Sequence, residues 1–151
     1  MAVTIKGLDK LLKDLTKFGD DGAKAVVTQL GNSKSNIERG AISRVPFEFI
    51  FIKQKINSEV EDRGLTVKVG VEGTDENPIP AYVEFGTGQF AKNLLFSGEY
   101  DQEIRDIAIK FKKDVDGRSP ATPYLFPAFF EERPKLIERL EKELDQLARK
   151  V

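Results

Sequence analysis

Residues 62–71, DRGLTVKVGV, contain the clearest strand signal in the chain. From Leu65 to Val71, apolar side chains alternate with threonine, lysine and glycine. This alternation predicts a β-strand with one buried face. The preceding Asp62-Arg63-Gly64 has the composition of a hairpin turn, so a second strand is expected before it.

Strand-forming side chains fill the region from Phe47 to Val60. Ile50, Ile52, Ile56 and Val60 share one parity, and Phe47, Phe49 and Phe51 share the other. A strand with this pattern is apolar on both faces. The three phenylalanines therefore belong either to a core covered by a helix on the second face or to a subunit interface, and the pattern favours neither. A third strand is predicted from Ala81 to Phe85.

Two amphipathic helices are predicted before the strands. The first carries Leu8, Leu11, Leu12, Leu15 and Phe18 at helical spacing, and should end near Gly19. The second carries Ala23, Val26, Val27, Leu30, Ile37 and Ala41. It should be capped by Asp20 or Asp21, run to about Arg44 and stop before Pro46.

The longest apolar stripe lies at the C-terminal end, in a helix expected from Pro127 to Lys150. Its members are Phe129, Leu136, Ile137, Leu140, Leu144, Leu147 and Val151. Pro134 lies inside this helix, and a proline there removes a backbone donor and crowds the preceding turn. A kink or a short break is therefore predicted near Arg133.

The start of this helix is predicted from Thr122, a suitable N-cap, and Pro123, which suits the first helical position. Pro127 allows either a single turn before the main helix or a main helix that begins at Pro127. A further amphipathic helix is predicted from Asp101 to Lys113, ended by Asp116-Gly117.

Helical patterns thus occupy both ends of the chain and strand patterns its middle. This order predicts an α+β fold, in which long N-terminal and C-terminal helices pack on a small antiparallel β-sheet. The 151 residues fit a single domain, 1–151. Gly31 and Gly40 should either weaken the second helix or allow another element to approach it closely.

The composition excludes several classes of function. The chain has 24 basic and 25 acidic side chains, a balance that does not favour wrapping nucleic acid. It contains no cysteine and no histidine, which removes disulfides, thiolate metal sites and histidine-based catalysis. No signal peptide or membrane-spanning stretch is present in the sequence, so a soluble protein is expected in the cytoplasm where it is made.

A glycine motif follows the predicted third strand. Residues 86–91, GTGQFA, match the G-x-G-x-x-A pattern that lets backbone N–H groups approach a pyrophosphate. That chemistry requires a βαβ unit, whereas these strands are expected to be antiparallel. We therefore predict a tight turn at Gly86 and Gly88, and no cofactor.

Two acidic features could suggest a catalytic or metal-binding site, but a structural role is expected for both. Glu84 could act as a general acid or base, but between Val83 and Phe85 it is expected to face solvent or a subunit contact. Asp75, Glu76 and Asn77 could offer oxygens to a cation, but their spacing matches no calcium loop. No metal site and no catalytic residue are predicted.

The order of these segments resembles a known family. The opening Gly7-Leu8-Asp9-Lys10-Leu11-Leu12 and a long second helix precede two motifs, residues 81–88 (AYVEFGTG) and residues 121–128 (ATPYLFPA), and a charged terminal helix follows. The whole is similar to the gene-product-ten-like family of HK-type siphophages, which are tail-completion or neck proteins. The resemblance covers most of the chain, and its two central motifs are specific only in combination.

Membership would imply a virion protein without catalytic activity, acting in rings between the portal complex and the tail tube. It would also imply long helices on a small antiparallel sheet. The family's strand-and-turn motif maps to Tyr82–Gly88, which includes Glu84, Phe85, Gly86 and Thr87, and its helix-start motif maps to Thr122–Pro127. These residues, with Phe47, Phe49 and Phe51, are the candidate structural turn and interface residues.

The sequence also departs from the family pattern. A proline and a short Thr-Gly-x-Leu segment usually follow the second helix, whereas here Pro46 is followed by Phe47-Glu48-Phe49-Ile50-Phe51. Residues 93–117 look like an additional helical insertion.

The leading hypothesis is therefore a head–tail joining or tail-completion protein of a phage or prophage. Its expected partners are copies of itself in a ring and the neighbouring head-completion and tail proteins, with DNA passing through without sequence-specific binding. It would be made in the host cytoplasm and act in the virion, without a membrane. The alternatives are an adaptor domain that binds one partner protein through residues 47–51, and a small enzyme or nucleotide binder that uses Glu84 and the glycine turn.

Overall fold

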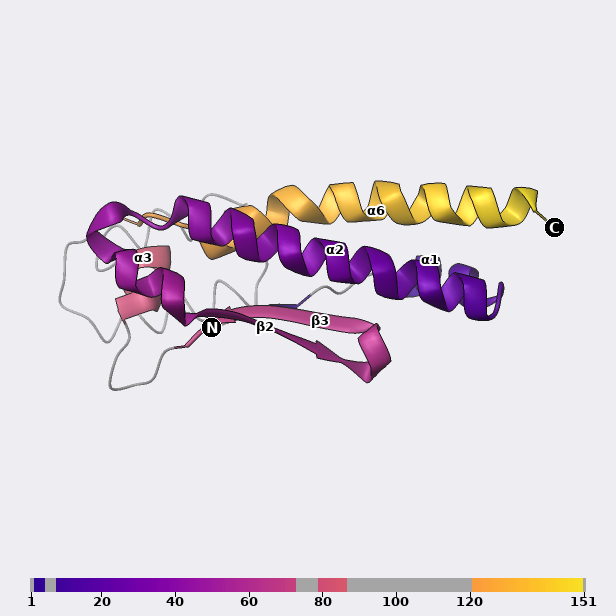
Figure 1. The fold of residues 1–151 in the computed structure, drawn as a ribbon. Helices are drawn as coiled ribbons and strands as arrows, with labels where there is room; N and C mark the ends of the chain where they lie inside the picture. Colours follow the sequence, from indigo (N-terminus) through magenta and orange to yellow (C-terminus); the bar gives the residue numbers. More distant parts are fainter. Residues whose placement is uncertain (1, 5–7, 73–78, 87–120, 151) are drawn as a thin grey trace.

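The computed structural model describes residues 2–4, 8–72, 79–86 and 121–150 (Figure 1). The fold is α+β, as the sequence predicts. Two 25-residue helices, α2 (Asp20–Arg44) and α6 (Leu125–Arg149), lie side by side and antiparallel, and a small antiparallel sheet covers one side of the pair. The short helix α1 (Asp9–Thr16) packs against the far end of both long helices.

The sheet has three strands in the order β1-β3-β2, with β1 at Ala2–Thr4, β2 at Ile56–Glu61 and β3 at Thr66–Val71. Val67, Val69 and Val71 are buried, as the alternation predicts, but Leu65 lies before the strand and is 41% exposed. The hairpin turn is also confirmed, and Asp62, Arg63 and Gly64 all have positive φ. The turn lies close to α2, because a Cβ added to Gly64 would come within 2.9 Å of a Val27 methyl group.

The prediction of a strand beginning at Phe47 was wrong. Phe47–Lys55 forms a 3₁₀ helix, η1, which is kinked at Phe49, and β2 begins only at Ile56. Ile52 is fully buried and Phe49 packs against the core, whereas Ile50 and Phe51 between them are exposed.

The predicted third strand was also wrong. Ile79–Phe85 forms a helix, α3, and the third strand of the sheet is β1 at the other end of the chain. A run of five apolar-rich residues does not distinguish a period of 2 from one of 3.6. Pro80 is tolerated in the first turn of a helix, so it does not oppose this conformation.

The ends of the long helices agree only partly with expectation. α2 stops at Arg44 as predicted, but its N-cap is Gly19, and Asp20 and Asp21 lie in the first turn without capping it. Acidic side chains there still interact favourably with the helix dipole. α6 runs through Pro134, so the short break predicted as one alternative near Arg133 was wrong, while the kink stays a prediction. The predicted helix at 101–113 and its end at Asp116-Gly117 lie outside the described residues.

The core divides into two clusters along the molecule. One surrounds α3, η1 and the first turns of α6, and includes Phe85, Phe126 and Ile52. The other lies between α1, the first half of α2 and the second half of α6, and includes Leu15, Leu30 and Leu140. None of the helices within the described residues is long and apolar enough to cross a membrane.

Candidate functional site

Glu84 is the most unusual residue of the predicted site. It lies on α3, next to the first turn of α6, and its side chain is completely buried. The expectation that it faces solvent or a subunit contact was therefore wrong. Because α3 is a helix, Glu84 does not alternate with Val83 and Phe85, and all three side chains are buried.

The Glu84 carboxylate caps the N-terminus of α6. Oε2 accepts hydrogen bonds from the backbone N–H groups of Tyr124 at 2.8 Å and Leu125 at 2.9 Å, and Oε1 accepts one from Phe126 at 2.9 Å. The first residues of any helix have N–H groups without intrahelical partners. The next residue, Pro127, has no N–H, so Glu84 satisfies every free donor in this turn.

The predicted cap of α6 was wrong in its residues. Tyr124 is the N-cap, not Thr122, and Leu125 is the first helical residue, not Pro123 or Pro127. The backbone N–H of Thr122 instead donates to the Val83 carbonyl at 2.8 Å. The Tyr124 hydroxyl donates to the Pro80 carbonyl at 2.9 Å. We call this set of hydrogen bonds between α3 and residues 122–126 the Glu84 clasp.

Burial and hydrogen bonding act on Glu84 in opposite directions. Burial raises the pKa of its carboxyl, and the three backbone N–H groups lower it, with a net pKa of about 6. Burial also raises the pKa of the Tyr124 hydroxyl, and the nearby Glu84 charge raises it further. The Glu84 carboxylate is therefore ionised at neutral pH and forms charge-assisted hydrogen bonds.

This geometry limits what Glu84 can do chemically. Both of its oxygens are engaged by backbone donors, and no part of the side chain reaches the surface. A general acid or base must come within hydrogen-bonding distance of a substrate. The arrangement therefore favours a structural role for Glu84 over a catalytic one.

Gly86 ends α3. Its φ of 74° lies in the left-handed region that glycine favours, and its N–H donates to the Tyr82 carbonyl at 2.7 Å. The predicted turn at Gly86 is thus present, but it follows a helix and not a strand. The G-x-G-x-x-A pattern therefore lacks the strand that a dinucleotide site requires. Thr87 and Gly88, like Asp75, Glu76 and Asn77, lie outside the described residues.

The other aromatic members of the predicted site divide between core and surface. Phe85 is fully buried, with its ring centroid 5.5 Å from that of Phe126, and Tyr82 is half-buried. Phe49 packs against the core. Phe47 and Phe51 are exposed, so they are the two whose position fits an interface.

A second buried carboxylate was not predicted from the sequence. Glu132 of α6 is 5% exposed, and its Oε1 accepts hydrogen bonds from Ser33 at 2.9 Å, Asn36 at 3.1 Å and Arg139 at 2.6 Å. Both Ser33 and Glu132 occupy core positions within the apolar stripes of their helices. A polar residue at such a position is the sequence signal that could have revealed this pair.

A polar cleft of about 340 Å³ opens beside this network, between α2 and α6. Arg44 and Lys135 line it, and both pair with Glu131. Among the described residues, no group of three or more acidic side chains could hold a metal ion.

No family model matches the chain, and comparisons with curated proteins and with solved structures find no match.

Proposed function

We propose that this chain is a non-enzymatic structural protein of a long-tailed phage or prophage, which completes the tail or joins the head to the tail. In this proposal it assembles into a ring in the neck of the virion, after synthesis in the host cytoplasm. Its neighbours are head-completion and tail proteins, and DNA passes through the ring without sequence-specific contacts.

The Glu84 clasp is the observation that carries the proposal. The resemblance to tail-completion proteins rests on two motifs, Tyr82–Gly88 and Thr122–Pro127, which are far apart in the sequence. Glu84 of the first motif caps the helix that begins in the second. The two motifs thus share one physical task, which is to close the fold around the start of α6.

Three further observations support a scaffold. Glu84, the candidate for acid–base chemistry, is buried, and both of its carboxylate oxygens accept hydrogen bonds from backbone N–H groups. Phe47 and Phe51 are exposed, where apolar side chains favour contacts between proteins. The near-neutral net charge of −1 also suits a ring through which DNA slides.

Native mass spectrometry combined with negative-stain electron microscopy tests this proposal. We expect the purified protein to form closed rings and to bind the head-completion or tail proteins encoded by neighbouring reading frames. Turnover of a substrate by the purified protein, or normal assembly of infectious particles without it, would contradict the proposal.

An adaptor that binds a single partner protein through residues 47–51 is the second candidate. The same exposed phenylalanines favour it. The two candidates differ in stoichiometry: an adaptor stays monomeric alone and forms a one-to-one complex, whereas a neck protein forms rings with its own copies.

A further inference from the structure

An apolar surface projects from one end of the molecule. Phe47, Ile50 and Phe51 on η1 are 85%, 53% and 39% exposed. We call these three side chains the aromatic knob. They lie close together in the sequence on η1, on either side of its kink at Phe49, between the C-terminal end of α2 and the start of β2. Exposed apolar patches of this kind mark interaction sites.

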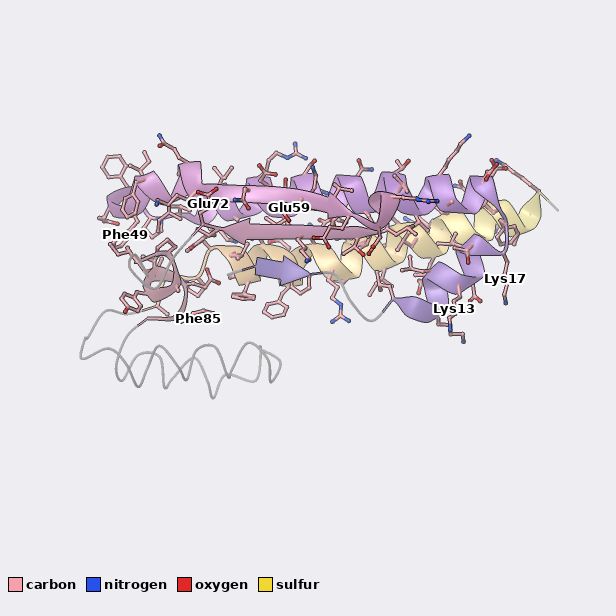
Figure 2. All side chains as sticks on the ribbon, turned by 90° about the horizontal axis from the view of Figure 1, so that it is seen from below. Lys13, Lys17, Phe49, Glu59, Glu72 and Phe85 are labelled. Carbon is pink, nitrogen blue, oxygen red and sulfur yellow. The ribbon has the colours of Figure 1, made fainter. Side chains whose placement is uncertain are left out.

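An apolar groove lies at the opposite end of the molecule. It has a volume of about 390 Å³, and Leu8 and Leu11 from the α1 side and Ile137 and Leu144 of α6 line it. We call it the terminal groove. Figure 2 shows the two ends: Phe49 of η1 lies at one, and Lys13 of α1 lies at the other.

We propose that the aromatic knob of one subunit docks in the terminal groove of the next copy of the chain. This inference rests on the proposed ring and names the two surfaces that would build it. An exposed apolar patch and an apolar groove at opposite ends of one molecule can give a head-to-tail contact, which closes into a ring when the rotation between neighbours permits.

The charges beside the two surfaces favour a second copy as the occupant. η1 carries two basic residues, Lys53 and Lys55, and one acidic residue, Glu48, so its net charge is +1. The groove is lined by Asp14 and Glu141 with Lys10, a net charge of −1. Opposite charges around an apolar contact steer association and fix its register.

The contact can be tested by cross-linking because the chain contains no cysteine. The double variant Phe47→Cys/Lys10→Cys places one thiol on the knob and one at the groove, at opposite ends of the molecule. Under mild oxidation we expect a ladder of covalent oligomers. The matched control Phe47→Cys/Glu59→Cys moves the second thiol to β2, away from the groove, and should give no ladder.

A second variant, Phe47→Asp/Phe51→Asp, places charge on the knob. Both side chains are exposed, so the fold should remain, as far-UV circular dichroism can verify. We expect these subunits to be monomeric by native mass spectrometry under conditions in which the wild type forms rings.

The outcomes separate this inference from the proposed function. Rings that persist in the Asp variant, without a ladder in the knob–groove variant, would overturn the contact and leave the ring in place. Disulfide dimers from Phe47→Cys alone would indicate a knob-to-knob contact and would also overturn it. A wild type that never forms rings would remove both the ring and this contact.

Discussion

The carboxylate of Glu84 and the backbone N–H of Phe126 are 42 residues apart in the sequence and 2.9 Å apart in the structure. The same carboxylate also accepts hydrogen bonds from Tyr124 and Leu125. A helix is usually capped by the residue that precedes it. Here the cap comes from another helix, so the first turn of α6 gains its cap only when α3 packs against it.

Replacing Glu84 with Ala should lower the free energy of unfolding by about 1–3 kcal/mol, because the backbone N–H groups of residues 124–126 would be left buried without an acceptor. Chemical denaturation at neutral pH measures the effect. Glu138→Ala is the matched control, since Glu138 lies on α6, the helix that Glu84 caps, and its side chain is 67% exposed. Equal stability of the two variants would show that Glu84 does not cap α6.

Glu84 also predicts a pH dependence. Its pKa is about 6 in the folded protein, above the ordinary value of 4.5, because burial disfavours the ionised form. A raised carboxyl pKa means that folding takes up a proton between these values. Stability should therefore rise as pH falls from above 6 to below 4.5, by about 2 kcal/mol for a shift of about 1.5 units.

Other groups titrate in the same range, so the effect must be measured as a difference. Glu131 accepts hydrogen bonds from Arg44 and from Lys135, in that order of effect, and these lower its pKa. The stability that Glu131 contributes is therefore lost as pH falls, which opposes the effect of Glu84. The unfolding free energy of the wild type minus that of Glu84→Gln isolates Glu84. A difference that does not change between pH 7 and pH 4.5 would refute the raised pKa.

The sequence predicts the elements whose pattern is long. α2, α6 and β3 each present a regular series of apolar residues, and the prediction of each was confirmed. η1 and α3 were misassigned because both are short and rich in β-branched or aromatic side chains. Their helical conformation depends on tertiary contacts, such as the burial of Ile52 and the clasp around Glu84.

The two segments that form the Glu84 clasp were selected from the sequence, but the hydrogen bonds between them were not predicted. The string Tyr82–Gly88 and the segment Thr122–Pro127 were both selected, yet no local pattern links Glu84 to the backbone of Phe126. A carboxylate that caps a distant helix has no spacing rule, unlike a local N-cap. The sequence does contain one indirect sign, since Tyr124, the N-cap of α6, has no side chain of the kind that caps a helix locally.

The Glu132 network gives a third prediction. The Glu132 carboxylate pairs with Arg139 and accepts a hydrogen bond from Ser33. Replacing Glu132 with Gln removes its charge and should lower the unfolding free energy by about 1–3 kcal/mol. Its neighbour Glu131 pairs only at the surface, so Glu131→Gln should have a much smaller effect. Similar losses in both variants, measured by urea denaturation, would show that the buried network adds nothing beyond a surface pair.

Two of the three glycines in α2, Gly31 and Gly40, provide the last prediction. Alanine favours a helix over glycine by up to about 1 kcal/mol. At Gly31 an added Cβ would meet no atom within 4 Å, so Gly31→Ala should be stabilising by roughly that amount. At Gly40 the Cβ would lie 3.1 Å from the Cβ of Ala128, so α6 would have to shift, and Gly40→Ala should be less stable than Gly31→Ala. Thermal unfolding of both variants tests this order, and an equal gain at the two positions would mean that α2 and α6 are not in close contact at Gly40.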